Sequence, residues 1–225
     1  MPVTSWTIIG KTRGNGPEAE QALNRLCGLY WKPVYAWFRA RGLSNEAAKD
    51  LTQDFFGSVI ERRDLFQRYD PDRGRFRAFI FRRMQWFWVD HLRKRGTGGD
   101  KRTVSFDEGA PEPEADEKYA PDREFDRNWA RETLEAAKRV LAASLIASGH
   151  ELRLRVFELR VWQRLSVADT AQHLGVSEEK VKNELRAYYR ALVKTLRDLV
   201  RATVNTDADT EEELAYLRRL LGNEP

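Results

Sequence analysis

One stretch of the sequence, residues 96–121, constrains the fold more than any other feature because it divides the chain. It contains Gly96, Gly98 and Gly99 near its start, three prolines, and acidic residues between them. Glycine and proline oppose helix and strand alike, and this segment has too few large apolar side chains to offset the entropy lost on ordering. We therefore expect a poorly ordered linker here, with a folded module on either side.

Both flanking segments have the residue pattern of amphipathic helices. Ala, Leu, Arg and Glu are more frequent than Val, Ile and Thr, a composition that favours helix over strand. Apolar residues recur at spacings of three and four, and no segment shows the alternation of a strand. The prediction is an all-α fold of two helical modules. Its parts are a first module at 1–95, an acidic linker at 96–121, a second module at 122–204 and an amphipathic helical tail at 205–225.

The net charge of +4 conceals a separation of charge along the chain. Residues 1–102 carry 20 basic against 11 acidic side chains, and residues 127–204 carry 15 against 9. The strip at 103–126 reverses this with 2 against 9, and the tail at 205–225 has 2 against 6. Two basic helical blocks around an acidic strip indicate two polyanion-binding modules. The alternative, that the basic helices are simply solvated, stays open on charge alone.

Residue types that carry catalysis or bind metals are scarce and scattered. The lone Cys27 excludes an internal disulfide and any cysteine-rich metal site. The three histidines are isolated, and no glycine-rich phosphate loop occurs. The acidic residues at 70 and 72 lie in a segment rich in turn-forming residues, so we interpret them as part of a turn and not as a catalytic pair. No apolar run reaches the roughly 20 residues of a membrane span, and no signal peptide begins the chain. We expect a cytoplasmic protein that is not an enzyme, without metal or cofactor.

The second module contains the pattern of a helix-turn-helix between Ser166 and Leu199. Ser166 is predicted to cap a short helix, Gly175 to make the turn in a left-handed conformation, and Ser177 to cap a second helix. The apolar residues predicted to be buried in the second helix are Val181, Leu185, Tyr189, Leu192, Leu196 and Leu199.

Other faces of this second helix carry basic and amide side chains. The N-terminal part of such a helix enters the major groove of DNA, where Arg, Lys and Asn pair with base edges and phosphates. The alternative is an ordinary helical hairpin with a basic face. The candidate DNA-binding residues are Lys180, Lys182, Asn183, Arg186 and Arg190.

A helix predicted from Phe76 to Arg95 has more aromatic residues than one buried stripe can use. Phe76, Ile80, Met84, Phe87 and Trp88 share one side and are expected in the core. A second aromatic and basic side would suit unpaired bases, which stack on rings while cations contact the phosphates. The alternative is that its aromatic residues pack under the linker or against the other module. This second side comprises Phe79, Arg82, Trp86, Val89, Asp90 and Arg93.

In this order the two modules resemble the extracytoplasmic-function sigma factors of the sigma-70 family over nearly the whole chain. The run Asp-Leu-Thr-Gln-Asp-Phe-Phe at 50–56 resembles the family's polymerase-binding motif Asp-Leu-Val-Gln-Glu-Val-Phe. Residues 82–95 resemble its minus-ten recognition helix, and 166–199 resemble region four, which reads the minus-35 element. The resemblance implies polymerase contacts through Lys49, Asp50, Gln53 and Asp54, and minus-ten contacts through Phe79, Arg82, Trp86, Asp90 and Arg93.

The function implied by the resemblance is that of a specificity subunit for promoter recognition. Region two would dock on the coiled coil of the polymerase beta-prime subunit and capture flipped-out single-stranded bases. Region four would lie beside the beta flap and read duplex DNA. The alternative is a stand-alone helix-turn-helix regulator of duplex DNA, which leaves the aromatic and basic first module unexplained.

Three departures from the family's pattern bear on regulation and specificity. Ala47 and Lys49 replace two acidic residues of the polymerase-binding helix, and Trp86 stands where the recognition helix usually has Asn. The Tyr-Trp at 30–31, the loop sequence at 70–77 and the tail resemble a subgroup associated with Ser/Thr kinases, so a kinase or an anti-sigma factor is an expected partner. Thr52 is a candidate phosphorylation site, since a phosphate would restore negative charge to this helix. The alternative is that Thr52 lies in the core.

Overall fold

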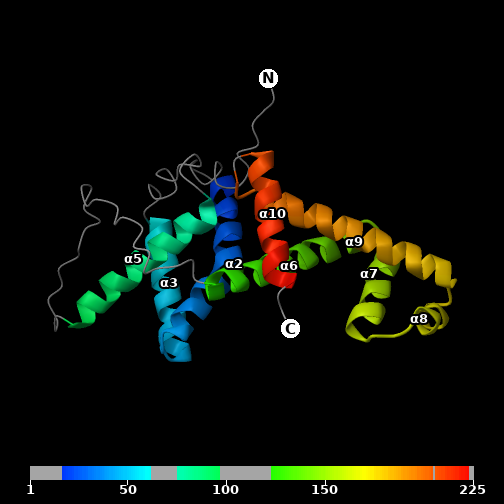
Figure 1. Ribbon diagram of the computed structural model, residues 1–225, viewed down its shortest axis with the longest axis horizontal. Helices are drawn as coiled ribbons and strands as arrows, with labels where there is room; N and C mark the ends of the chain where they lie inside the picture. The colour runs from blue at the N-terminus through cyan, green and yellow to red at the C-terminus, as the bar shows by residue number, and fades with distance from the viewer. Residues whose placement is uncertain (1–16, 62–74, 97–122, 205, 223–225) are drawn as a thin grey trace, which may run out of the picture. The chain divides into compact units, whose positions relative to one another are not determined.

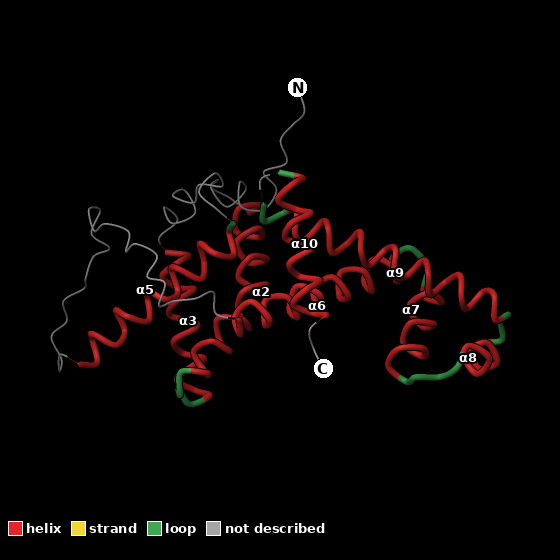
Figure 2. The backbone as a smooth tube through the Cα atoms, viewed as in Figure 1, coloured by secondary structure: helices red, strands yellow, loops and turns green. Residues whose placement is uncertain are grey.

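The computed structural model describes residues 17–61, 75–96, 123–204 and 206–222 (Figure 1). Every regular element within these residues is a helix (Figure 2), which confirms the predicted all-α fold. None of these helices combines the length and apolar character needed to cross a membrane. The helices are α2 (Pro17–Ala40), α3 (Asn45–Glu61), α5 (Phe76–Gly96), α6 (Arg123–Ala147), α7 (Glu151–Phe157), the π-helical turn η2 (Glu158–Trp162), α8 (Val167–Leu174), α9 (Glu178–Arg201) and α10 (Asp207–Gly222).

The chain divides into two compact units. Unit 1 comprises residues 1–132 together with 202–225, and unit 2 comprises residues 133–201. This division differs from the expected modules, because it falls within α6 and groups the C-terminal tail with the first module. Gly96 is the last residue of α5, and the rest of the expected linker and the predicted turn at 69–74 lie outside the described residues.

In unit 1, α2 and α3 lie side by side and are joined by a short turn (Figure 1). Gly42 has a φ of 85° after the end of α2, as expected of a helix stop at glycine. The backbone N–H of Ala47 donates to the Ser44 hydroxyl over 3.1 Å, so Ser44 caps α3. Proline inside a helix is expected to kink the helix or to start a new one. No new helix begins at Pro33, because α2 continues through this residue.

Aromatic side chains form the core between α2, α3 and α5. Trp37 and Phe38 of α2 are fully buried, and the Phe38 ring lies 5.9 Å from Trp88 of α5. The Phe55 ring of α3 lies 5.5 Å from Phe87 of α5 in an edge-to-face arrangement. These contacts hold α5 against both other helices. The apolar residues of α3 that recur at spacings of three and four are all buried, namely Ala48, Leu51, Phe55 and Val59.

Unit 2 is built on two apolar clusters that both include α9. The larger contains Leu141 of α6, Phe157 of α7 and Tyr188 of α9, whose ring stacks on Phe157 at 4.0 Å. The smaller joins Val156, Ala171 and Val181.

The prediction that Tyr189 lies in the core is wrong. Tyr188 is 1% exposed, whereas Tyr189 is 46% exposed. Successive residues of a helix point about 100° apart, so one position separates a core side chain from a surface one. Both tyrosines satisfy a spacing of three or four from a buried neighbour, and only the position of α7 selects Tyr188.

Candidate functional site

The residues predicted to bind polymerase share the solvent side of α3. Lys49, Asp50, Gln53 and Asp54 are all exposed, while the intervening Leu51 is buried. Positions 49 and 53, and 50 and 54, are one helical turn apart, which places all four on one face. Ala47 is also exposed, so the two lost acidic positions belong to this surface.

The hydroxyl of Thr52, the candidate phosphorylation site, is not accessible to solvent in folded unit 1. Thr52 is 0% exposed, and its hydroxyl donates a 2.6 Å hydrogen bond to the backbone carbonyl of Ala48. Its side chain follows Ala48 by one helical turn and therefore points toward the core. Hence a kinase cannot reach this hydroxyl without opening the packing around α3.

On α5, one arginine that sequence analysis did not single out connects two predicted aromatic residues. The guanidinium of Arg83 lies 5.3 Å from the Phe79 ring and 5.2 Å from the Trp86 ring. The spacing of four and three residues places all three side chains on one helix face. Phe79 and Trp86 are half-buried, so part of each ring remains on the surface. The arrangement offers a cation and two rings to a planar or anionic ligand.

The remaining predicted minus-ten residues lie farther along α5. Arg82 and Arg93 are exposed, and Asp90 forms an ion pair of 2.7 Å with Lys94. Phe79 also packs on Phe76, with ring centroids 5.9 Å apart. Phe79 therefore has a packing contact within α5 in addition to its partly exposed position, and the alternative of packing under the linker or against the other module stays untested.

In unit 2, a tight turn joins α8 to α9. The Ser166 hydroxyl accepts from the backbone N–H of Asp169 at 3.0 Å, and Ser177 accepts from that of Lys180 at 3.2 Å. Gly175 has a φ of 64° and a ψ of 34°, a left-handed conformation that residues with a Cβ rarely adopt. The two predicted caps and the glycine turn are present, and they set the direction in which α9 leaves.

The predicted DNA-binding residues of α9 are all exposed along its first half. Arg186 donates to the side-chain carbonyl of Asn183 at 3.3 Å, so these two side chains lie together. Glu184, which sequence analysis did not single out, accepts from Lys180 and from Arg153 of α7, each at 2.9 Å. The hydrogen bond from Lys180, followed by that from Arg153, holds the pKa of Glu184 below its usual value. Glu184 thus partly neutralises Lys180.

Within the described ranges, no three His, Cys, Asp or Glu side chains come together in an arrangement that would hold a metal ion.

Comparison with known proteins identifies the family of one segment. Residues 29–97 match the family model of sigma-70 region 2. Neither a curated protein nor a solved structure matches the chain. The matched range contains α3 and α5 and the C-terminal half of α2. The match concerns a segment of unit 1 and supports a sigma-70 region 2 in this part of the chain.

Proposed function

We propose that this chain is a sigma factor of the extracytoplasmic-function type that binds core RNA polymerase and directs it to promoters. The match of residues 29–97 to sigma-70 region 2 carries the proposal, because this range includes the surfaces predicted to bind polymerase and melted DNA. The test is run-off transcription with purified core polymerase and a series of promoter fragments. Specific transcripts that depend on the protein are expected, and their absence with every fragment would overturn the proposal.

The polymerase-binding surface proposed here is the exposed face of α3. Lys49, Asp50, Gln53 and Asp54 present a mixed rather than a uniformly acidic surface to solvent. The family binds polymerase through an acidic helix face. A face of mixed charge would have weaker electrostatic complementarity to the same polymerase surface. We also propose that a Ser/Thr kinase or an anti-sigma factor regulates this protein, and that the protein is located in the cytoplasm.

For promoter melting, we propose that the α5 surface around Trp86 stacks unpaired bases of the minus-ten element. Trp86→Ala is expected to lower the fraction of open complexes by about fivefold to a hundredfold, since stacking on a ring contributes roughly 1–3 kcal/mol per base. Permanganate footprinting of the melted strand measures this. Core polymerase affinity and the thermal midpoint of the variant are expected to equal those of the wild type.

The matched control for this experiment is Leu92→Ala. Leu92 is 47% exposed on the same helix and is not part of the proposed base-binding face. If Trp86→Ala unfolds unit 1, or if Leu92→Ala reduces opening equally, the ring has a packing role and stacking is not its function.

We propose that α8 and α9 form a helix-turn-helix that reads duplex minus-35 DNA, with Asn183 and Arg186 at the base edges. Arg186→Ala is expected to weaken binding to the preferred duplex by about 1–3 kcal/mol and to relax preference at one base pair, as loss of a bidentate contact does. Competition binding against single-base-pair variants measures both effects. A uniform loss over all sequences with a shallower salt dependence would identify a phosphate contact instead.

The alternative function, a stand-alone duplex-DNA regulator, would use the second module only. Native co-purification separates the two functions. A sigma factor is recovered with core polymerase, whereas a stand-alone regulator binds its duplex site without polymerase and is not recovered with it.

A further inference from the structure

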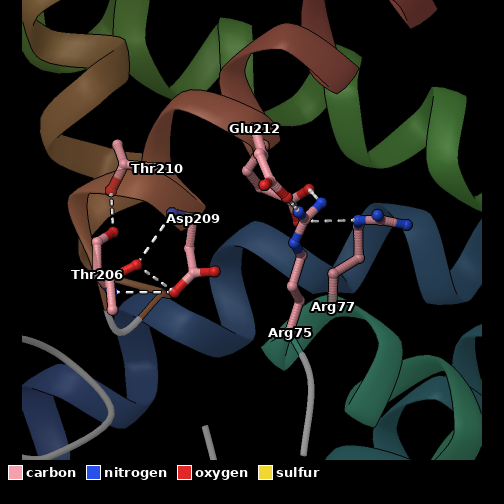
Figure 3. A network of polar contacts seen from close by, with 7 residues as sticks. Arg75, Arg77, Thr206, Asp209, Thr210 and Glu212 are labelled. Carbon is pink, nitrogen blue, oxygen red and sulfur yellow. Dashed lines mark hydrogen bonds and ion pairs between the residues drawn. The ribbon is translucent and has the colours of Figure 1, made fainter. Parts of the chain in front are cut away.

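Within unit 1, the C-terminal helix α10 contacts the start of α5 through charged residues outside the surfaces assigned above (Figure 3). Its start is defined by a reciprocal cap. The Thr206 hydroxyl accepts from the backbone N–H of Asp209 at 3.0 Å, while the Asp209 carboxylate accepts from the backbone N–H of Thr206 at 3.1 Å. Thr210 adds a 2.9 Å hydrogen bond to the Thr206 carbonyl. After this cap, Glu212 and Glu213 in the first half of α10 contact Arg75 and Arg77 at the start of α5.

The inner part of the contact is a buried ion cluster around Arg77 of α5. Its guanidinium forms ion pairs with Asp126 of α6 and Glu213 of α10. It also lies 5.0 Å from the Trp129 ring and 4.7 Å from the Tyr216 ring. Burial opposes the charge of Arg77, but the negative charges of Glu213 and Asp126 outweigh it and raise the pKa of the guanidinium above its usual value. Arg77 therefore stays charged and is held between the carboxylates of Asp126 and Glu213.

The outer part of the contact is open to solvent. Arg75 contacts Glu213 at 2.9 Å with one nitrogen and Glu212 with the other. The Glu212 side chain is 68% exposed, and an ion pair with so exposed a partner contributes little stability. An anion from solution can therefore replace Glu212 at Arg75 without disturbing the buried cluster.

Beside this outer pair lies a shallow depression in the surface of unit 1. It is lined by Arg75, Glu212, Ala215, Arg218 and Arg219. Three arginines thus line it together with one exposed glutamate. Arg218 forms no ion pair with any described residue, and the guanidinium of Arg219 lies 5.5 Å from the Tyr216 ring. Guanidinium groups donate paired hydrogen bonds that match the oxygens of phosphate.

We propose that this depression is a phosphate-binding site, which Arg75, Arg218 and Arg219 form and which Glu212 screens in the unliganded protein. The phosphate belongs either to a nucleic-acid backbone or to a free nucleotide. In both cases it displaces Glu212 from Arg75 and leaves the Arg77 cluster intact. The site goes beyond the proposed promoter contacts, because it combines the tail helix with the start of α5 and needs neither polymerase nor unit 2.

The experiment measures binding of two probes to the full-length protein by fluorescence anisotropy, namely a short labelled single strand of DNA and labelled ATP. Glu212→Gln is expected to tighten binding about threefold to tenfold at low salt, because the competing carboxylate is removed. The double variant Arg218→Gln with Arg219→Gln is expected to weaken it by a similar factor and to reduce the salt slope for DNA. A change with the DNA probe alone identifies a nucleic-acid backbone, and a change with ATP alone identifies a nucleotide.

Two matched controls make the result specific. Glu211→Gln removes the same charge from the neighbouring residue of α10, and Arg127→Gln removes an exposed arginine elsewhere in unit 1. All five substituted residues are exposed and lie outside the buried cluster, and circular dichroism is used to confirm that each variant is folded. The proposal is overturned if the double arginine variant binds both probes as the wild type does. It is also overturned if Glu211→Gln tightens binding as much as Glu212→Gln. Failure of the transcription assay would contradict the proposed function and leave this result unaffected.

Discussion

Replacing Arg77 with Met is expected to lower the free energy of unfolding of unit 1 by about 3–5 kcal/mol and to release α10. The substitution removes the only cation that contacts both Asp126 and Glu213 within the described residues. Asp126 is 3% exposed and Glu213 is 2% exposed, so both carboxylates would stay buried. Asp126 would keep the Tyr216 hydroxyl as a partner, and Glu213 would keep the more exposed Arg75. Removing one partner of a buried ion pair has a cost of this size, because the uncompensated charge remains. Urea denaturation measures the loss, and hydrogen exchange at α10 amides measures the release.

The control for this prediction is Arg75→Met. Arg75 is also paired with Glu213, but its side chain is 28% exposed and Arg77 would still neutralise the carboxylate. A loss below about 1 kcal/mol is expected there. Adding Asp126→Asn and Glu213→Gln to Arg77→Met is expected to recover much of the stability, since no charge is then left buried. Wild-type stability of Arg77→Met would show that the cluster does not hold α10.

Thr52→Glu is expected to lower the free energy of unfolding of unit 1 by about 4 kcal/mol or more. Much of the variant protein would then be unfolded and would not bind polymerase. The wild-type side chain is completely buried, and its hydroxyl donates a hydrogen bond to the Ala48 carbonyl. A longer, ionised side chain would be both too large for this space and unpaired in the core. The thermal midpoint, followed by circular dichroism, measures the loss.

Two further variants separate burial of charge from the other changes at this position. Thr52→Val keeps the shape and loses only the hydroxyl, for which a cost of about 1 kcal/mol is expected. Gln53→Glu adds the same charge at the exposed neighbour and is expected to leave stability unchanged within about 0.5 kcal/mol. If Thr52→Glu instead keeps wild-type stability and binds polymerase more tightly, Thr52 is accessible and regulation by phosphorylation at this residue is supported.

Local sequence determined the helices of this protein and several of their ends. Serine at 44, 166 and 177 caps a helix in each case, because a side-chain oxygen three residues before a free backbone N–H can satisfy it without help from the rest of the fold. Gly175 turns the chain in the left-handed region for an equally local reason. The exposed faces of α3 and α9 followed from the same spacing that identified their buried stripes.

Only the tertiary structure decided which of several equivalent positions is buried and what the tail does. Helical spacing allows either Tyr188 or Tyr189 in the core of unit 2, and the stacking of Phe157 of α7 selects Tyr188. The spacing likewise left Thr52 at the margin of the buried stripe, and full burial follows from the packing around α3.

The largest difference between sequence and structure concerns the tail. Its apolar spacing predicted a helix, but nothing local indicates that Glu213 pairs with Arg77, 136 residues earlier in the chain. Arg75 and Arg77 resemble the many solvated arginines of a basic module until α6 and α10 bring Asp126, Glu212 and Glu213 to them. Caps, turns and helix faces depend on neighbours within a few residues, so the sequence by itself determined them. Ion pairing between distant segments depends on which surfaces meet, and only the packed fold determines that.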